Sequence, residues 1–271
     1  MNYRKLNHLI SPFLAQQVEA IYELVSGDHE QFYKTIPNGI IGLTVLVEGS
    51  AWTMDDSNWE AVQKTSLYGM IKSPSLIKVS KNCRDISIVF NPVFFAALLK
   101  VPMYLISNRF TNAADLFMKH DLGELEESFS AALSDKEIIN AAEKFLLKYR
   151  DKEVDRTLLS AYQKISTVSY NRVSDLSLDL NISSRTLLNR FNDKIGLSPK
   201  ELMRIFRINS ALDIKKHMPQ NLTDLAFKLG YFDQAHFIHD FKQTLGITPE
   251  QYFKNDLLIS DFYNSERWNL S

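Results

Sequence analysis

The most regular pattern of hydrophobic and polar positions in this chain lies in residues 221–253. Its first part predicts a short helix that is capped by Thr223 and ends at Gly230, because glycine accepts the positive φ found at many helix C-termini. The apolar positions of this helix are Leu225, Ala226, Phe227 and Leu229. A second helix begins after a short turn, and this spacing predicts a helix-turn-helix pair.

The second helix of the pair is predicted from Gln234 to about Thr244, with Asp233 as its N-cap. Hydrophobic residues recur along it every four positions, as on the buried face of a helix. They are Phe237, Phe241 and Leu245. Gly246 closes this helix, and residues 248–251 have the pattern of a capping box with proline at the first helical position. A third helix is therefore predicted to follow.

The same plan occurs about 50 residues earlier, in residues 172–203, so the chain contains an internal repeat. Phe191 stands where Phe241 stands in the later copy, and Asn181 stands where Gly230 does. Asparagine is the residue that best replaces glycine in the left-handed region, so the turn can keep its geometry. The offset between the copies is 49 before this turn and 50 after it, so the second copy has one more turn residue.

A helix predicted over residues 199–216, with Ser198 and Glu201 as its capping box, joins the two copies. Two helix-turn-helix units joined by one helix, the second containing HFIHDFKQTLGITPEQY, resemble the DNA-binding domain of the AraC/XylS transcription regulators. The resemblance covers residues 169–255. It implies a sequence-specific regulator of transcription whose partner is double-stranded DNA, with the two units in successive major grooves about 34 Å apart.

The resemblance assigns the DNA-binding surface to the outward positions of the second helix in each unit. These are Ser184, Arg185, Asn189 and Arg190 in the first unit, and Gln234, Ala235, His236, His239 and Lys242 in the second. The early positions, with Asn189 or His239, are expected at base edges, and Arg190 and Lys242 at phosphates. The family usually has arginine where this chain has Asn189 and His239. The alternative is that these positions are solvated helix faces.

Residues 1–120 show a different pattern, of alternating and β-branched runs separated by glycine and proline, which predicts a small barrel or sandwich. Strands are predicted at residues 18–24, 40–48, 66–71, 76–79 and 86–90, and helices at 92–100 and 103–110. The order of these elements resembles the distantly cupin-like N-terminal domain of one subgroup of the same regulators. In that subgroup an aspartate usually stands where this chain has Asn38.

The expected fold class is therefore α+β, with a small cupin-like β-barrel and closing helices at the N-terminus and an all-α domain of two helix-turn-helix units at the C-terminus. Residues 1–120 are expected to sense an effector or to dimerise. Residues 121–168 predict two or three connecting helices, which supply a dimer face in the family or simply pack on their own barrel. Residues 256–271 form a C-terminal extension whose apolar residues predict packing against one of the domains.

Charge changes this interpretation only slightly. The formal net charge is −1, but residues 160–271 contain 14 Lys or Arg against 12 Asp or Glu, which gives about +2 there and about −3 in the rest. A weakly basic DNA-binding domain should have modest non-specific affinity and should need doubled sites or dimerisation. The chain has no run of 18 apolar residues and no charged-then-apolar leader, so a cytoplasmic location without a membrane partner is expected.

Catalytic and metal-binding patterns are missing from the sequence. Cys83 is its one cysteine, which excludes an intramolecular disulfide, and the chain has no G-x-S-x-G elbow, P-loop or G-x-G-x-x-G. The histidines before the C-terminal domain are His8, His29 and His120, and none has the spacing of a metal ligand. We therefore expect no enzymatic activity, no cofactor and no metal.

Three partners other than DNA stay open at this point: a small-molecule effector, RNA polymerase and a second copy of the chain. Trp52, Trp59, Tyr68 and Tyr104 could line an effector cavity or belong to an ordinary core. The competing hypothesis is a small-molecule-binding barrel protein whose helical part makes protein contacts. The polar outward positions of both units favour the DNA-binding regulator.

Overall fold

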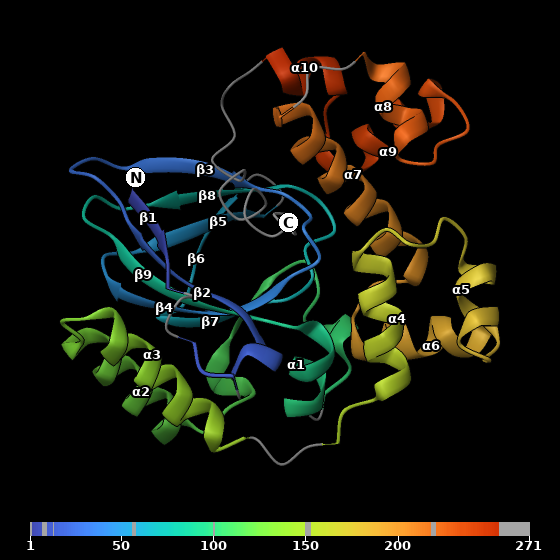
Figure 1. Ribbon diagram of the computed structural model, residues 1–271. Helices are drawn as coiled ribbons and strands as arrows, with labels where there is room; N and C mark the ends of the chain where they lie inside the picture. Colours follow the sequence, from blue (N-terminus) through green and yellow to red (C-terminus); the bar gives the residue numbers. More distant parts are fainter. Residues whose placement is uncertain are drawn as a thin grey trace.

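The computed structural model describes residues 2–6, 10–12, 14–55, 58–99, 101–149, 153–217 and 221–254. Two antiparallel sheets fill the N-terminal half, and helices occupy most of the rest (Figure 1). This arrangement confirms the predicted α+β class. Residues 256–271, for which packing against a domain is expected, lie outside the described residues. No helix in the described ranges is long and apolar enough to cross a bilayer.

The strands form two sheets that face each other without closing into a barrel. The larger sheet has the order β1-β2-β9-β4-β7-β10 and the smaller has the order β3-β8-β5-β6. The strands are β1 (Asn2–Lys5), β2 (Val18–Val25), β3 (Gln31–Thr35), β4 (Ile41–Glu48), β5 (Ala51–Asp55), β6 (Asn58–Ala61), β7 (Thr65–Tyr68), β8 (Ser75–Val79), β9 (Arg84–Phe90) and β10 (Phe110–Asn112). All five predicted strands are present, and β1, β3, β5, β6 and β10 are additional.

Helices cover the outer face of the larger sheet. They are α1 (Pro92–Leu98), α2 (Lys119–Ala131) and α3 (Asp135–Leu147). Side chains alternate between the two faces of a strand, so Ile86, Ile88 and Phe90 of β9 point to the same side and share a core with Phe129 of α2. Leu133 is 95% exposed because α2 ends before it and Ser134 caps the next helix.

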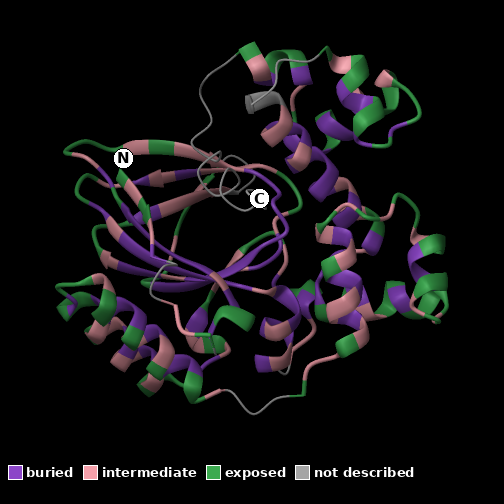
Figure 2. Ribbon diagram, in the orientation of Figure 1, coloured by how far each residue is buried: buried purple, intermediate pink, exposed green. Residues whose placement is uncertain are grey.

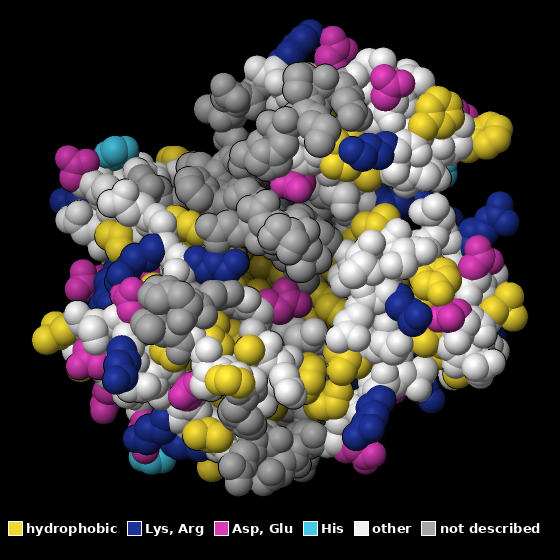
Figure 3. Space-filling model, in the orientation of Figure 1, with side chains coloured by type: hydrophobic (Ala, Val, Ile, Leu, Met, Phe, Trp, Pro, Cys, Tyr) yellow, Lys and Arg dark blue, Asp and Glu magenta, His cyan; other side chains and the backbone are white. Residues whose placement is uncertain are grey.

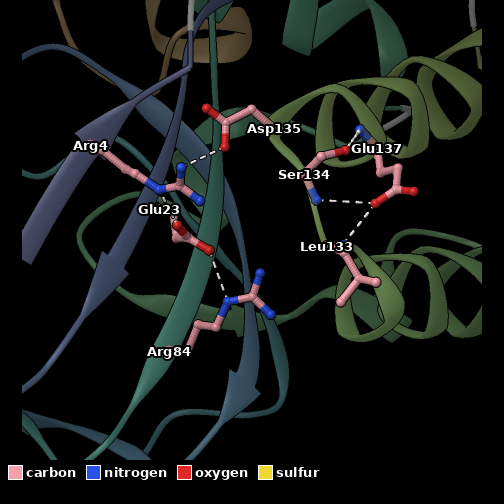
Figure 4. A network of polar contacts seen from close by, with 7 residues as sticks. All are labelled: Arg4, Glu23, Arg84, Leu133, Ser134, Asp135 and Glu137. Carbon is pink, nitrogen blue, oxygen red and sulfur yellow. Dashed lines mark hydrogen bonds and ion pairs between the residues drawn. The ribbon is translucent and has the colours of Figure 1, made fainter.

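A buried carboxylate joins this helical layer to the sheet (Figure 4). Glu23 on β2 accepts hydrogen bonds from Arg4 on β1 and from Arg84 on β9, the latter at 2.8 Å. Arg4 also donates to Asp135, the first residue of α3, at 2.5 Å. Burial opposes the ionisation of Glu23, but the two guanidinium groups outweigh it and hold its pKa below the usual range.

The prediction of a helix over residues 103–110 is wrong beyond its first turn. Only a single 3-10 turn, η3 (Met103–Leu105), forms there, and β10 begins at Phe110. Asn108 adopts a positive φ of 60°, and its side chain accepts from the backbone N–H groups of Lys72 and Ser73. The chain turns at this point, and β10 then pairs antiparallel with β7 at the edge of the larger sheet.

The remaining helices form two groups around one long helix. They are α4 (Arg156–Ser166), α5 (Val173–Asp179), α6 (Ser184–Lys194), α7 (Pro199–His217), α8 (Leu222–Lys228), α9 (Gln234–Leu245) and α10 (Pro249–Lys254). Figure 1 shows α4, α5 and α6 beside the sheets and α8, α9 and α10 at the far end of α7. The described residues also contain the short 3-10 turns η2 (Leu14–Gln16) and η4 (Ala113–Asp115).

The core does not stop at the boundary between the sheets and the helices. Phe90 of the larger sheet, Phe145 of α3, Phe191 of α6 and Phe206 of α7 all belong to one cluster of buried residues. Figure 2 shows this burial continuing from the sheets into α4 and α7. The helices at the far end of α7 have a separate cluster, which receives Ile36 from the sheet side.

The turn of residues 36–40 connects the sheets to α7. The side-chain amide of Asn209 on α7 donates to the carbonyl oxygen of Pro37 at 3.0 Å, and the hydroxyl of Tyr162 on α4 donates to that of Gly39 at 3.2 Å. Gly39 has a φ of +71°, and a Cβ there would lie 2.9 Å from the ring of Phe206. Asn38 accepts a hydrogen bond from the N–H of Ile40, as an aspartate at its position could.

Candidate nucleic-acid interface

The second unit consists of α8, a turn and α9. Asn221 caps α8 by accepting from the N–H of Asp224 at 2.8 Å, so the prediction of Thr223 as the cap is wrong. Thr223 lies inside the first turn, where its hydroxyl donates to the side chain of Gln234 at 2.8 Å. Gly230 has a φ of +75°, as the turn requires. This turn sets α8 against α9.

Helix α9 follows the predicted pattern closely. Asp233 caps it by accepting from the N–H of His236 at 2.7 Å, and Gly246 ends it with a φ of +77°. Phe237 and Phe241 are fully buried and pack edge to face, with ring centroids 5.7 Å apart. The capping box predicted at residues 248–251 is formed and starts α10. The apolar stripe therefore fixes which face of α9 points outward.

The first unit repeats this geometry with different residues. Asn181 occupies the left-handed region with a φ of +53°, which confirms its equivalence to Gly230. Ser183 caps α6 by accepting from the N–H of Thr186 at 3.0 Å. Leu187 and Phe191 are buried on one face of α6. Both second helices are thus oriented by a cap, a buried stripe and a glycine after their last turn.

Five of the nine predicted DNA-binding residues project from these helices with exposed side chains and no partner among the described residues. They are Arg185 and Asn189 on α6 and Ala235, His239 and Lys242 on α9. Their positions follow from the buried stripes, since a residue two positions from a buried one lies on the opposite face of a helix. Their contact with DNA stays a prediction.

The other four predicted residues make contacts within the protein. Ser184 shares a hydrogen bond with Ser177 of α5 at 2.8 Å, Gln234 accepts from Thr223, and Arg190 lies 3.3 Å from Asp155. The ring of His236 stands edge-on to Tyr231, with centroids 5.1 Å apart, and its Nε2 lies 3.8 Å from Asp240. DNA contacts by these side chains would have to replace or extend the contacts already present.

Sequence reasoning missed a buried cluster that holds α9 against α7. Arg207 of α7 lies over the ring of Tyr231, 4.6 Å from its centroid, and 3.7 Å from the carboxylate of Asp240. Both charged residues are buried, and burial raises the pKa of Tyr231. The signal for this cluster is an arginine within the apolar run of residues 205–208, but no local pattern identifies its partner on α9.

A second candidate site lies between the two sheets. An inner cavity of about 60 Å³ and an outer groove of about 800 Å³ lie there, and Thr35, Val62, Tyr68, Ile71 and Phe110 line both. Of the aromatic residues proposed for an effector cavity, Tyr68 is the one found in either lining. Trp52 and Trp59 instead lie against the ammonium of Lys78, and Tyr104 is exposed. Among the described residues no group of three potential metal ligands comes together.

Two protein-family models match the chain. Residues 176–255 match a helix-turn-helix domain, and residues 7–112 match a domain of unknown function (DUF6597). The chain is 30% identical over 74 residues to the HTH-type transcriptional regulator MtrA of Neisseria gonorrhoeae, covering 27% of this chain and 25% of that protein. It is 28% identical over 82 residues to the HTH-type transcriptional activator RhaS of Escherichia coli, covering 30% and 28%. The chain thus spans about a quarter of the length of these curated relatives.

Among solved structures, ToxT from Vibrio cholerae aligns with 88% of this chain and 97% of its own, with 17% identity and a TM-score of 0.44. One structure of that protein is bound to an unsaturated fatty acid. The matched helix-turn-helix segment contains α6, α7, α8 and α9, and so covers the second helices of both units and the helix that joins them. Residues 176–255 therefore match a helix-turn-helix domain, and the relatives named here, to which the chain is similar over 74 and 82 residues, are transcriptional regulators.

Proposed function

We propose that this protein regulates transcription by binding double-stranded DNA through both helix-turn-helix units. One observation carries the proposal: α6 and α9 each present outward polar side chains that have no partner among the described residues, and α7 joins the two units. Arg185 and Asn189 on α6, with His239 on α9, are suited to base edges, and Lys242 is suited to phosphates. No catalytic role is part of the proposal.

The length and packing of α7 support a fixed spacing between the units. Its 19 residues span about 28 Å at 1.5 Å per residue. Ile205 and Phe206 are buried in the core shared with the sheets, and Ile208 and Ala211 are buried in the core of the second unit. A helix that is fixed at both ends can place the second helices of the two units in successive major grooves on one face of the duplex. The protected DNA should therefore be asymmetric and should span nearly two turns per subunit.

The test begins with selection of bound fragments from a random or genomic DNA pool, followed by footprinting. On the selected site, Arg185→Ala should cost roughly 1–3 kcal/mol and relax the base preference at one position. Lys242→Ala should weaken all sequences alike and lower the slope of affinity against salt by about 1. Asn189→Arg and His239→Arg restore the charge usual in the family and should strengthen binding. Unchanged binding in both alanine variants would contradict the assignment.

We also propose that the sheet domain senses an effector. We propose two protein partners as well. One is a second copy of the chain, which binds through the exposed side of α2 and α3, and the other is RNA polymerase. Burial of one face of these two helices on the sheet leaves the other available. We also propose a cytoplasmic location, because the proposed partner is DNA. Sedimentation of the full chain with and without its selected DNA tests the dimer, and a monomer in both states would exclude it.

A further inference from the structure

The inner cavity between the sheets adjoins the outer groove, because the two spaces share part of their lining. The five residues that line both spaces come from β3, β7, β10 and the segments next to them. A volume of about 60 Å³ has room for about two water molecules, or for one small polar group of a larger molecule. The groove, at about 800 Å³, has room for the rest of such a molecule. The polar group of such a ligand would thus contact the lining of the cavity, and the rest of the ligand would contact the lining of the groove.

The inner wall of the cavity carries a buried carboxylate. Asp85 lies on β9 and is 5% exposed, so its carboxylate is removed from bulk water. Ser87 donates a hydrogen bond to it at 3.3 Å, and the Ser87 hydroxyl is itself 2.7 Å from that of Thr44. Tyr33 from the facing sheet also lines the space. The wall therefore offers hydrogen-bonding groups around one acid.

Asp85 differs from the other buried carboxylate of this sheet. Glu23 is held by Arg4 and Arg84, whereas no basic side chain pairs with Asp85 within the part of the chain that the structure describes. Lys34 lines the cavity but forms no ion pair with Asp85 there. A buried charge without a counter-ion is costly, and burial accordingly raises the pKa of Asp85 to about 7. A cation that enters the cavity would remove this cost.

We propose that the cavity binds a small polar molecule that carries an ammonium or guanidinium group, with Asp85 as its counter-ion. The body of the ligand lies in the outer groove, whose walls include Thr53, Ser66 and Asn108. A carboxylate ligand is disfavoured in the inner cavity because it would face a like charge. This inference rests on the proposed sensing role and names the chemical class that is sensed.

The position of the cavity connects the ligand to the DNA-binding helices. Ile36, Asn38 and Ile40 line it, and they belong to the turn that contacts α7. Ile36 is also part of the buried core of the second unit. A ligand head that displaces this turn therefore acts on α7 through one shared side chain and one hydrogen bond.

Full-length protein and thermal unfolding provide the test, at a pH above the pKa of Asp85. Methylguanidinium and putrescine at millimolar concentration serve as cationic probes, and octanoate and glucose serve as anionic and neutral probes. The cations should raise the melting temperature and the other two should not. Asp85→Asn should raise the melting temperature of the ligand-free protein, because it removes an uncompensated buried charge, and should abolish the shift caused by the cations. Glu48→Gln removes an exposed charge from the same sheet and should leave that shift intact.

Two outcomes would overturn the proposal: cations that give no shift in the natural protein, or a shift that persists in Asp85→Asn. A shift caused by octanoate and lost in Asp85→Asn would do the same. DNA binding is measured separately on the selected site. We expect Asp85→Asn without ligand to bind that site as the natural protein does, so failure of the ligand proposal leaves the DNA-binding proposal standing.

Discussion

The two helix-turn-helix units share one sequence plan but are anchored in different ways. In the first unit, Leu176, Leu187 and Phe191 are buried in the same core as the sheets. The second unit buries Phe237 and Phe241 in a core of its own, to which the sheet domain contributes Ile36. A repeat in sequence therefore fixes the local geometry of a unit without fixing what the unit packs against.

The glycine after the second helix marks the same difference. Gly196 in the first unit and Gly246 in the second both have a positive φ, near +80°. A Cβ at Gly196 would lie 2.0 Å from the hydroxyl of Ser107 and 2.9 Å from the carbonyl oxygen of Met103, whereas a Cβ at Gly246 would meet nothing within 4 Å. The first unit is therefore fitted closely against the sheet domain at this point. The second unit has open space at this point. Phe227 and Phe232 of this unit are exposed. Figure 3 shows hydrophobic side chains on the surface of the helices at the far end of α7.

The largest difference between the two units is expected when a buried ring is removed from each core at equivalent positions. Phe191→Ala and Phe241→Ala should each cost about 3–5 kcal/mol, because both rings are fully buried. Phe191→Ala should lower the unfolding midpoint of the sheets and helices together, while Phe241→Ala should open the second unit alone. Hydrogen exchange by mass spectrometry distinguishes these outcomes. Equal protection loss over the sheets in both variants would show that the second unit is not separate.

A smaller effect is expected from the two glycines. Gly246→Ala should cost about 1–3 kcal/mol, the usual cost of a positive φ in a residue with a Cβ. Gly196→Ala should cost roughly a further 1–3 kcal/mol, because the added methyl group is overpacked against Ser107 and Met103. Denaturant unfolding measures both. In a Ser107→Gly background the extra cost should fall but not vanish, since the backbone of Met103 stays close, and equal costs for the two glycines would refute the close fit.

The smallest predicted effect concerns Arg190, which pairs with Asp155 in the first unit. Asp155→Asn keeps the helix cap, because asparagine can also accept from the N–H of Leu158, but it removes the charge. Stability should change by less than about 1 kcal/mol, as for other half-exposed ion pairs. Affinity for DNA should rise for all sequences alike, since Arg190 becomes available to phosphates.

Asp193→Asn is the matched control for Asp155→Asn, because Asp193 lies on α6, the helix of Arg190, and pairs with its neighbour Lys194 instead of with Arg190. Equal affinity gains in the two variants would mean that net charge alone is responsible. In that case Arg190 would have no special part in binding.

Local patterns predicted the helical units well and the sheet domain less well. Asp233, Gly246 and the stripe of Phe237 and Phe241 act over a few residues, so sequence alone placed α9 and its outward face. Strands β1 and β6 have four residues each and are partly exposed, so no hydrophobic alternation marks them. Their place is set by pairing with distant strands.

The candidate sites show the same limit. Sequence identified Arg190 as outward-facing, but its partner Asp155 lies on a different helix and could not be inferred. Asp85 has no sequence signal at all, since an acid in a strand usually points to solvent. Only the facing sheet makes it a buried group. The features that the sequence did not predict therefore depend on contacts between segments far apart in the chain.

Helix α4 bears on how the protein can be divided into parts that fold independently. Tyr162 of α4 packs edge to face on Phe206 of α7, with ring centroids 5.9 Å apart, and Ala161 and Ile165 are buried in the same cluster. A fragment that begins at residue 169 would leave these side chains behind and expose one side of α7 to water. We expect the smallest autonomous DNA-binding fragment to begin no later than Asp155, which caps α4. Even that fragment would present to solvent the surface that the sheets cover, so isolated expression should require added solubilising substitutions there.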